Sequence, residues 1–425
     1  MVWVVFGVMI TLVAINVPIG FALALTTIVL VLATSTTPLT VVPLKLFEGS
    51  SSFPLLAIPL FILAGGLMNF TGISRRLINL ASALVGFIRG GLAMANIVAS
   101  MFFAEISGSA VADAAALGTI IIPAMKLKGY PARFAAACVS SAASLAIIIP
   151  PSIPMILYAV MAESSVVQLF LAGFVPGIIG GGLMMALSYY FARKRNYPVE
   201  EAFSLRHVWK ALKEAAWALI LPVIILGGIF GGVVTATEGA GLAVIAAFVI
   251  GTFIYREMDV RQLKRIILES CIQTAVVMII VAASVLLAWY LTNERIPQHF
   301  AEAIIGTTSN PYMVLIFLNV FFLVAGMFLH SAAAIILIVP IVMPLVRQLG
   351  IDPTHFGIIV TLNLAIGQQT PPVASVLLTT CSIAGLPMAE VMKDNIYFIG
   401  VLLVVLILVT YVPIVPMFLV HLFYG

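Results

Sequence analysis

The sequence Gly367-Gln368-Gln369-Thr370-Pro371-Pro372 lies in the middle of a largely apolar run that extends from 354 to 384. A membrane-spanning helix satisfies its own backbone, and non-helical backbone survives at membrane depth only inside protein or beside a water-filled cavity. Proline lacks a backbone donor and frees the carbonyls about one turn earlier. Residues 367–372 therefore predict a helix that is broken at membrane depth.

A second break is predicted in the apolar run 132–161. Three serines and then Pro150-Pro151-Ser152 interrupt this run, and the prolines free carbonyls around Ala146 and Ile147. Unwound carbonyls at such a place are typical of a sodium site, because a hard cation takes oxygen ligands. A simple proline kink is the alternative interpretation.

Upstream of the first break, a polar interruption predicts a helical hairpin whose tip turns inside the membrane. Ser107-Gly108-Ser109 separates the apolar segments 92–104 and 110–125, with Glu105 before it and Asp113 after it. Ser109 is suited to cap the second helix, whose positive N-terminal end favours an anion, whereas the free carbonyls of the first helix favour a cation. The alternative is an ordinary turn between two spans, in which Asp113 complements the helix dipole.

The second hairpin tip is predicted near Gly326 to Ser331. His330 and Ser331 stand where Ser109 and Ala110 stand in the first tip. A histidine in an apolar stretch is usually structural, but at a hairpin tip it is also a candidate for substrate binding or proton transfer.

The two pairs of hairpin and break belong to an internal repeat with a constant offset. Six glycine or proline positions recur 221 residues later, without a gap: Gly7 and Gly228, Gly20 and Gly241, Pro123 and Pro344, Gly129 and Gly350, Pro150 and Pro371, Pro151 and Pro372. Duplicated halves are typical of secondary transporters, whose sites lie where the halves meet. By analogy, we expect two inverted structural repeats.

Composition sets the class of protein. Of 425 residues, 63% are hydrophobic and 8% are charged, against about 25% charged in an ordinary globular chain. We therefore expect an all-α polytopic membrane protein that crosses the lipid bilayer about 11 to 13 times. The net charge of +4 gives no indication of nucleic acid, and the basic clusters 193–213 and 256–265 predict the cytoplasmic side. The sequence has no GxxxxGK[ST], HExxH or GxSxG motif, which favours a transporter over an enzyme or an ATP-driven pump.

These features predict the organisation of the chain. Repeat one covers 1–195, with scaffold helices 1–70, an arm helix 72–90, a hairpin 92–126, a broken helix 131–161 and a span 166–192. A cytoplasmic amphipathic linker covers 196–216. Repeat two covers 217–416, with scaffold helices 217–292, an arm helix 294–308, a hairpin 311–347, a broken helix 353–384 and a span 396–416, and a C-terminal tail covers 417–425. Within 217–254, two crossings with a break near glycines 227–232 are expected; Thr235 and Glu238 fit a capping box, with a pathway carboxylate as the other role for Glu238.

Three segments together resemble a known family. Glu105-Ile-Ser-Gly-Ser-Ala-Val-Ala-Asp113, Pro150-Pro-Ser-Ile-Pro154 and 367–372 look like the large, DctM-type membrane subunit of TRAP (tripartite ATP-independent periplasmic) transporters, and the resemblance extends over essentially the whole chain. The sequence looks closest to sialic-acid members, although four-carbon dicarboxylate members share these motifs. The resemblance implies a sodium-driven, elevator-type importer in the bacterial cytoplasmic (inner) membrane. It also implies a small four-helix membrane subunit and a periplasmic substrate-binding protein as partners.

The resemblance further implies site residues at the matching positions. A first sodium site would involve Ala104, Ser107, Ala146, Ile149 and Pro150, and a second would involve Gly326, Gly367, Thr370 and Val373. Substrate would lie between the tips, near Ser107, Ser109, Asp113, His330, Ser331 and Gln368. His330 stands where many members carry an acid, and Ala146 stands where glycine is common.

Two other functions remain open at this point. Coupling to protons through Asp113, Glu105 or His330 would keep the transporter but change its energy source. A membrane assembly or lipid-modifying protein belongs to a different class, which the scarcity of acidic and histidine clusters disfavours.

Overall fold

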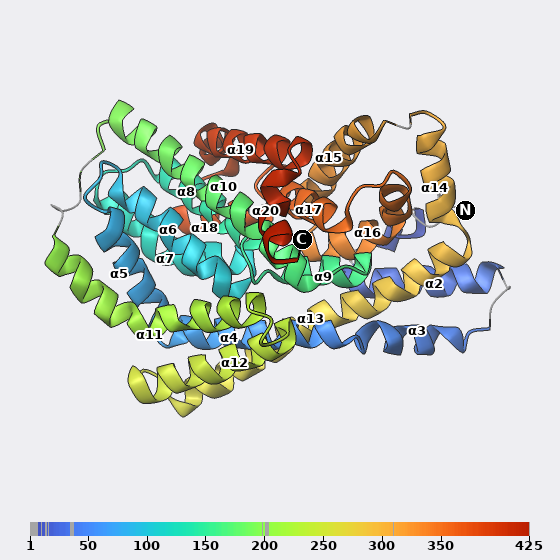
Figure 1. The fold of residues 1–425 in the computed structure, drawn as a ribbon, viewed down its shortest axis with the longest axis horizontal. Helices are drawn as coiled ribbons and strands as arrows, with labels where there is room; N and C mark the ends of the chain where they lie inside the picture. The colour runs from blue at the N-terminus through green and yellow to red at the C-terminus, as the bar shows by residue number, and fades with distance from the viewer. Residues whose placement is uncertain are drawn as a thin grey trace.

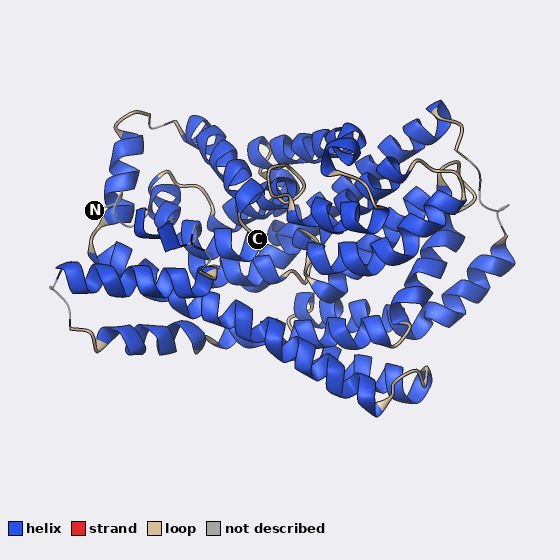
Figure 2. Cartoon of the chain, turned by 180° about the vertical axis from the view of Figure 1, so that it is seen from behind, coloured by secondary structure: helices blue, strands red, loops and turns tan. Residues whose placement is uncertain are grey.

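The computed structural model describes residues 7–9, 11–12, 15, 17–34, 38–197, 199, 204–308 and 310–424, with the side chains of residues 34 and 105–107 outside this description. Within the described ranges the chain forms helices and no strand (Figure 2). Nine of the helices described there are long and apolar enough to cross a membrane. The protein is thus an all-α polytopic membrane protein, as the composition predicts.

One layer of helices forms an elongated band along one side of the molecule, which we call the scaffold layer (Figure 1). It consists of α2 (Ile19–Thr34), α3 (Val41–Ser50), η1 (Phe53–Leu56), α4 (Ala57–Phe70), α11 (Leu205–Phe230), α12 (Ala236–Val249), η3 (Ile250–Ile254) and α13 (Val260–Asn293). Helix α13 packs against α2, α3 and α4. The approach of α3 to α13 requires a glycine, because a Cβ on Gly49 would lie 2.8 Å from the Cβ of Val285.

The remaining helices form a block against this layer, which we call the core block (Figure 1). It consists of α6 (Gly91–Ser107), α7 (Ala110–Leu127), α8 (Ala132–Ala143), η2 (Ser144–Ile147), α9 (Ile153–Ala162), α10 (Val166–Lys194), α15 (Pro311–Phe328), α16 (Ser331–Gln348), α17 (Pro353–Gly367), α18 (Ser375–Ala384), α19 (Met388–Tyr411) and α20 (Ile414–Tyr424). The amphipathic helices α5 (Ile73–Val85) and α14 (Ile296–Ile305) lie at opposite ends of the molecule.

The helix boundaries keep the spacing seen in the sequence. Helices α7 and α16 start at 110 and 331, and α8 and α17 start at 132 and 353, so both pairs differ by 221 residues. The pieces α3, η1 and α4 in the first half correspond, at the same offset, to the single long helix α13 in the second. The inverted relation of the two halves and the elevator motion stay predictions.

In the core block, the broken helix of each half packs against the hairpin of the other half. Helix α9 from the first half packs against α16 of the second, and α18 from the second packs against α7 and α8 of the first. In each contact, a basic side chain of the hairpin donates a hydrogen bond to the last carbonyl of the broken helix. Lys126 Nζ donates to Ala384 O at 3.4 Å, and Arg347 Nη2 donates to Ala162 O at 2.9 Å. A cation is favourable at the negative end of a helix, so each hairpin stabilises the C-terminal end of the other half's broken helix.

Two stretches differ from the predicted boundaries. Helix α11 starts at Leu205 and continues without interruption to Phe230, so the amphipathic residues of the predicted linker form the first turns of a membrane-length helix. Helix α19 ends at Tyr411 because Pro413 disfavours helical backbone at Val412, and α20 then includes most of the predicted tail. The break between α11 and α12 and the capping box of Thr235 with Glu238 are confirmed.

A buried ion-pair cluster ties α19 to α10 and α8. The side chain of Asp394 is 3% exposed, and Arg195 binds it with both nitrogens, at 2.6 and 3.1 Å. Arg133 Nε lies 3.2 Å from the same carboxylate. The hydrogen bonds to Asp394 raise the pKa of the Arg195 guanidinium above its ordinary value.

Replacing Asp394 with Ala leaves two arginines without their carboxylate in a shielded site. We expect Asp394→Ala to destabilise the purified chain by about 2 to 3 kcal/mol, somewhat less than for a fully buried pair because both arginines keep some contact with solvent. Thermal unfolding in detergent measures this. Lys210→Ala, which removes an exposed partner 4.0 Å from Glu214, serves as the control and should change stability by less than about 0.5 kcal/mol. Equal midpoints for the two variants would contradict the prediction.

Candidate functional site

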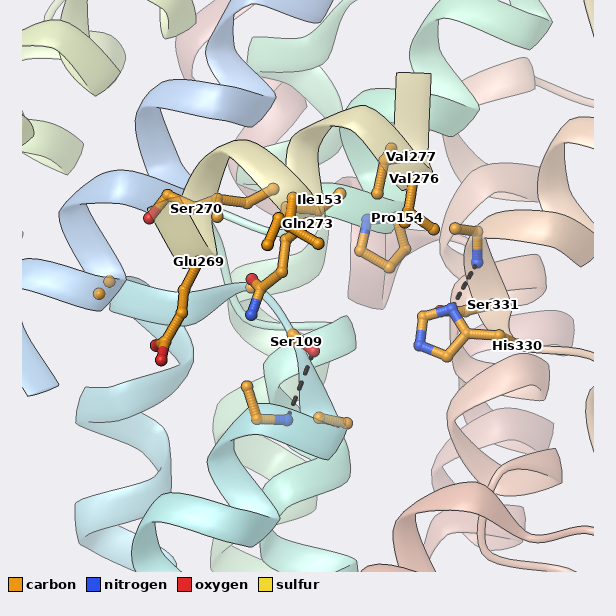
Figure 3. Close-up of a pocket in the computed structure, with 18 of the residues that line it drawn as sticks. Ser109, Ile153, Pro154, Glu269, Ser270, Gln273, Val276, Val277, His330 and Ser331 are labelled. Atoms are coloured by element: carbon orange, nitrogen blue, oxygen red, sulfur yellow. Dashed lines mark hydrogen bonds between the residues drawn. The ribbon is translucent and has the colours of Figure 1, made fainter. Parts of the chain in front are cut away.

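A cavity of about 550 Å³ lies between the core block and the scaffold layer (Figure 3). The core block contributes both hairpin tips, through Gly108 and Ser109 on one side and His330 and Ser331 on the other. The scaffold layer contributes α4 and α13. The cavity therefore lies at the interface between the core block and the scaffold layer, with both hairpin tips in its wall.

The first tip is shaped by a glycine and capped by a serine. Gly108 has φ +57°, and a Cβ there would lie 2.9 Å from Ile153 N and 3.3 Å from Pro151 O. Only glycine fits this close approach, which places the tip directly against the first break. Ser109 is the N-cap of α7, and its Oγ accepts from Ala112 N at 3.5 Å, as the sequence predicts.

The second tip is capped by a histidine. His330 is the N-cap of α16, and its Nδ1 accepts from Ala332 N at 3.4 Å, so the neutral ring carries its proton on Nε2. Figure 3 shows the imidazole at the cavity beside Ser331. Two helix N-terminal ends, α7 and α16, thus converge on one cavity, and their partial positive charges favour an anion between them.

The first break separates α8 from α9 by a non-helical segment rather than by a kink. Residues 148–152 follow η2 without helical structure, and Ser152 Oγ donates to Ile147 O at 2.8 Å. Helix α6, which contains Ala104, packs against η2, which contains Ala146. The described residues of the first predicted sodium site, Ala104, Ala146, Ile149 and Pro150, are all buried, and their role in sodium binding stays a prediction.

The second break, at residues 367–372, contacts the C-terminal end of α15, which is the first helix of the second hairpin. A Cβ on Gly367 would lie 2.5 Å from Gly326 Cα, so these two backbones touch. Val373 N donates to Met327 O at 3.3 Å, and Thr370 Oγ1 donates to Ile366 O at 2.9 Å. The structure thus places Gly326 and Gly367 in direct contact, with Val373 next to the same hairpin.

A hydrogen-bonded group that the sequence did not reveal joins α8 and α19 to the second break. Ser141 Oγ lies 2.6 Å from Gln369 Oε1 and 3.0 Å from Asn395 Oδ1, and Asn395 Nδ2 donates to Gln369 O at 3.1 Å. All three residues are buried. Asn395 precedes an apolar span, and no local pattern predicted its contact with residues of both halves.

Two other predicted substrate residues, Asp113 and Gln368, lie outside the cavity lining. Asp113 is fully buried in the first turn of α7 and does not line the cavity. Gln368 is also buried and outside the cavity lining, and its Oε1 accepts from Ser375 Oγ at 3.4 Å. The side chains of Glu105 and Ser107 lie outside the described residues. Ser109, His330 and Ser331 are the predicted substrate residues that line the cavity, and their role in binding stays a prediction.

Polar residues of the scaffold layer also line the cavity, and no sequence pattern pointed to them. Helix α13 contributes Glu269, Ser270 and Gln273, and α4 contributes Asn69. Glu269 lies close to the basic cluster 256–265, so in the sequence it resembles an ordinary interfacial charge.

Comparison with known proteins gives a consistent family. Residues 6–415 match the family model of the DctM component of the tripartite ATP-independent periplasmic transporter. The chain is 43% identical to the C4-dicarboxylate TRAP transporter large permease protein DctM of Pseudomonas aeruginosa, with 88% of each covered. It is 36% identical to the sialic acid TRAP transporter large permease protein SiaM of Vibrio cholerae, with 96% of each covered.

Two further similarities concern chain length and fold. The isethionate TRAP transporter permease protein DctMQ of Oleidesulfovibrio alaskensis is 39% identical over 98% of this chain, which spans 66% of that protein. Among solved structures, the YdaH transporter of Alcanivorax borkumensis superposes with a TM-score of 0.63 over 86% of each chain, at 14% identity. At that identity the likeness concerns the fold alone.

The contact between Gly326 and Gly367 predicts a sharp steric limit. We expect Gly367→Ala to force the α15 and α17 backbones apart and to destabilise the chain by about 1 to 3 kcal/mol, measured by thermal unfolding. A Cβ on Gly400 of α19 would meet no atom within 4 Å apart from the adjacent residues and backbone of its own helix, so Gly400→Ala is the matched control. That control should leave stability unchanged or raise it by up to about 1 kcal/mol, since alanine favours helix. A Gly367→Ala protein as stable as the control would rule out the close contact.

Proposed function

This chain belongs to the DctM family of TRAP transporters and is a large permease subunit, and we propose that it imports an organic carboxylate together with sodium. Sialic acid is the first candidate substrate and a four-carbon dicarboxylate the second. The proposed partners are a small four-helix membrane subunit and a periplasmic binding protein that delivers the substrate. The proposed location is the bacterial cytoplasmic membrane.

The convergence of two helix N-terminal ends on one cavity is the observation that carries this proposal. Ser109 and His330 cap α7 and α16, and both caps line the cavity. A carboxylate between the tips would face partial positive charge from both helices. The cavity volume of about 550 Å³ lies within the usual range for small-molecule sites.

The two breaks support sodium as the coupling ion. Sodium is transported in this scheme, and it takes neutral oxygens as ligands in the way that other hard cations do. Each break lies against the end of a hairpin: Gly108 against Pro151, and Gly367 against Gly326. Sodium bound at these junctions would fix the hairpin ends and thereby order the anion site, which couples the two ligands.

The exchange between halves supports movement of the core block as one body. Lys126 and Arg347 hold each hairpin to the broken helix of the other half. In the proposed elevator mechanism, the core block with its bound ligands slides along the scaffold layer and opens the cavity to the other side of the membrane.

Coupling to protons is the second candidate, because His330 lies at the cavity and is ionisable. The sodium scheme uses His330 as a cap only. Asparagine is also a good cap but does not titrate near neutral pH, so the two candidates make opposite predictions for His330→Asn.

The coupling ion is tested by uptake into proteoliposomes that contain the permease, its small subunit and its binding protein. We expect uptake of labelled sialic acid or succinate to stop when the sodium gradient is dissipated, and to continue when only the proton gradient is dissipated. Uptake that requires the proton gradient and ignores sodium would overturn the sodium proposal.

The role of His330 is tested with a pair of variants. Under sodium coupling, His330→Asn should retain most of the wild-type uptake, whereas His330→Ala should lose substrate affinity by about fivefold through loss of the cap. Failure of His330→Asn with normal folding would instead favour proton coupling.

The anion site at the first tip is tested in the same assay. We expect Ser109→Ala to weaken substrate affinity by about fivefold, because the capped N-terminus of α7 would lose its preorganised geometry. Ser165 caps α10 in the same way, with its Oγ accepting from Gln168 N, and lies outside the cavity lining. Ser165→Ala should therefore leave affinity unchanged, and equal effects of the two variants would remove the first tip from the site.

A further inference from the structure

The scaffold wall of the cavity is polar at one place. Glu269 and Gln273 are four residues apart on α13, so they lie on one face of the helix, and both line the cavity. In Figure 3 their side chains extend from the α13 ribbon on the side of Ser109. Val276 and Ile280 continue the same face with apolar side chains. Among the α13 residues that line the cavity, the hydrogen-bonding groups are thus gathered at this position, with Ser270 beside it.

The carboxylate of Glu269 keeps acceptor capacity toward the cavity. Its Oε1 lies 2.7 Å from Arg265 Nε, and its side chain is 44% exposed. An ionised carboxylate accepts about four hydrogen bonds, so a single arginine contact leaves most of this capacity open. Gln273 adds both a donor and an acceptor one turn further along the helix.

The two walls of the cavity therefore favour ligand groups of opposite charge. The tips present helix N-terminal ends that favour an anion, whereas α13 presents a carboxylate. A substrate held by its anionic group at the tips directs its remote end toward Glu269. A second carboxylate at that end would meet a like charge, while hydroxyl or amino groups would donate hydrogen bonds to it.

We propose that Glu269 and Gln273 form a second subsite, which binds hydroxyl or amino donors at the end of the substrate remote from its carboxylate. The substrate class is then a hydroxylated monoanion, such as a sugar acid, rather than a plain dicarboxylate. This inference rests on the proposed function, since it takes the anionic group to be held at the tips. The names of the relatives include sialic acid, isethionate and C4-dicarboxylate transporters, so family membership alone does not choose among these classes.

The subsite belongs to the scaffold layer, whereas the tips belong to the core block. A substrate that contacts both is held across their interface, and it loses the contacts with α13 when the core block moves. The subsite thus selects the substrate while the core block is in the position seen in this structure. After the core block has moved, the subsite no longer contacts the substrate.

Direct binding to the purified permease separates this subsite from the selectivity of the binding protein. The full chain with its small subunit is titrated in sodium chloride with sialic acid, gluconate and succinate, by isothermal calorimetry. We expect wild type to bind the two hydroxylated monoanions more tightly than succinate. Glu269→Gln should weaken their binding by about tenfold, because a hydrogen bond to a charged acceptor is lost, and should leave succinate binding equal or stronger.

Two further variants keep the test specific. Gln273→Leu should weaken the hydroxylated ligands without improving succinate, because it removes hydrogen bonds but no charge. Glu214→Gln is the matched control: Glu214 is also a scaffold glutamate with a basic partner at i−4, on α11, and it lies outside the cavity lining. This control should leave the ratio of sialic acid to succinate affinity unchanged.

The outcomes separate a failure of the proposed subsite from a failure of the proposed function. Tight binding of sialic acid or gluconate with an unchanged ratio in Glu269→Gln overturns the subsite and leaves the proposed function intact. Wild-type binding of succinate alone also overturns the subsite. A wild type that binds none of the three anions contradicts the proposed function, and the subsite with it.

Discussion

A hydrocarbon interior offers no partner to an unbonded backbone amide or carbonyl, and this constraint determines the architecture of the molecule. Two hairpin tips and two breaks interrupt the helices, and each must be covered by protein or by a polar cavity. The structure meets this demand by placing the interruptions against one another, with Gly108 beside Pro151 and Gly326 against Gly367. Because α9 and α18 each pack against the hairpin of the other half, helices surround these interrupted segments. Groups freed from helical bonding are thereby concentrated at these junctions.

The sequence predicted the parts of this arrangement that depend on local chemistry. Proline pairs and a glutamine pair inside apolar runs marked the breaks, because such residues are unfavourable in a lipid-facing helix. Ser109 was identified as a cap because serine is a preferred N-cap residue at the start of a helix. The constant spacing of glycine and proline located the second half of the chain, and the observed helix starts keep that spacing.

Other parts depend on contacts between distant residues and could not be predicted. Asn395 and Ser141 meet at Gln369 although they are separated by more than half of the chain, and each alone is an ordinary polar residue near an apolar run. Glu269 resembled an interfacial charge because its neighbours are basic, and only the packing of α13 against the core block places it at the cavity. Asp113 was expected near the substrate; it is fully buried in the first turn of α7 and lies outside the cavity lining, and its role stays a prediction. In each case the decisive information is the direction in which a helix face points, which local sequence does not specify.

The uninterrupted length of α13 has a consequence for the membrane around the protein. At about 1.5 Å per residue, its 34 residues extend roughly 50 Å, whereas the hydrocarbon layer is about 30 Å thick. The excess length is accommodated by tilt or by extension of the helix into the headgroup region, where the basic first turns of α13, with Arg261, Lys264 and Arg265, are favourable. In the first half, the corresponding stretch is divided into α3, η1 and α4 and can adjust at its joints. The scaffold layer thus pairs one continuous helix, which carries Glu269 at the cavity, with a segmented stretch of the first half that packs directly against it.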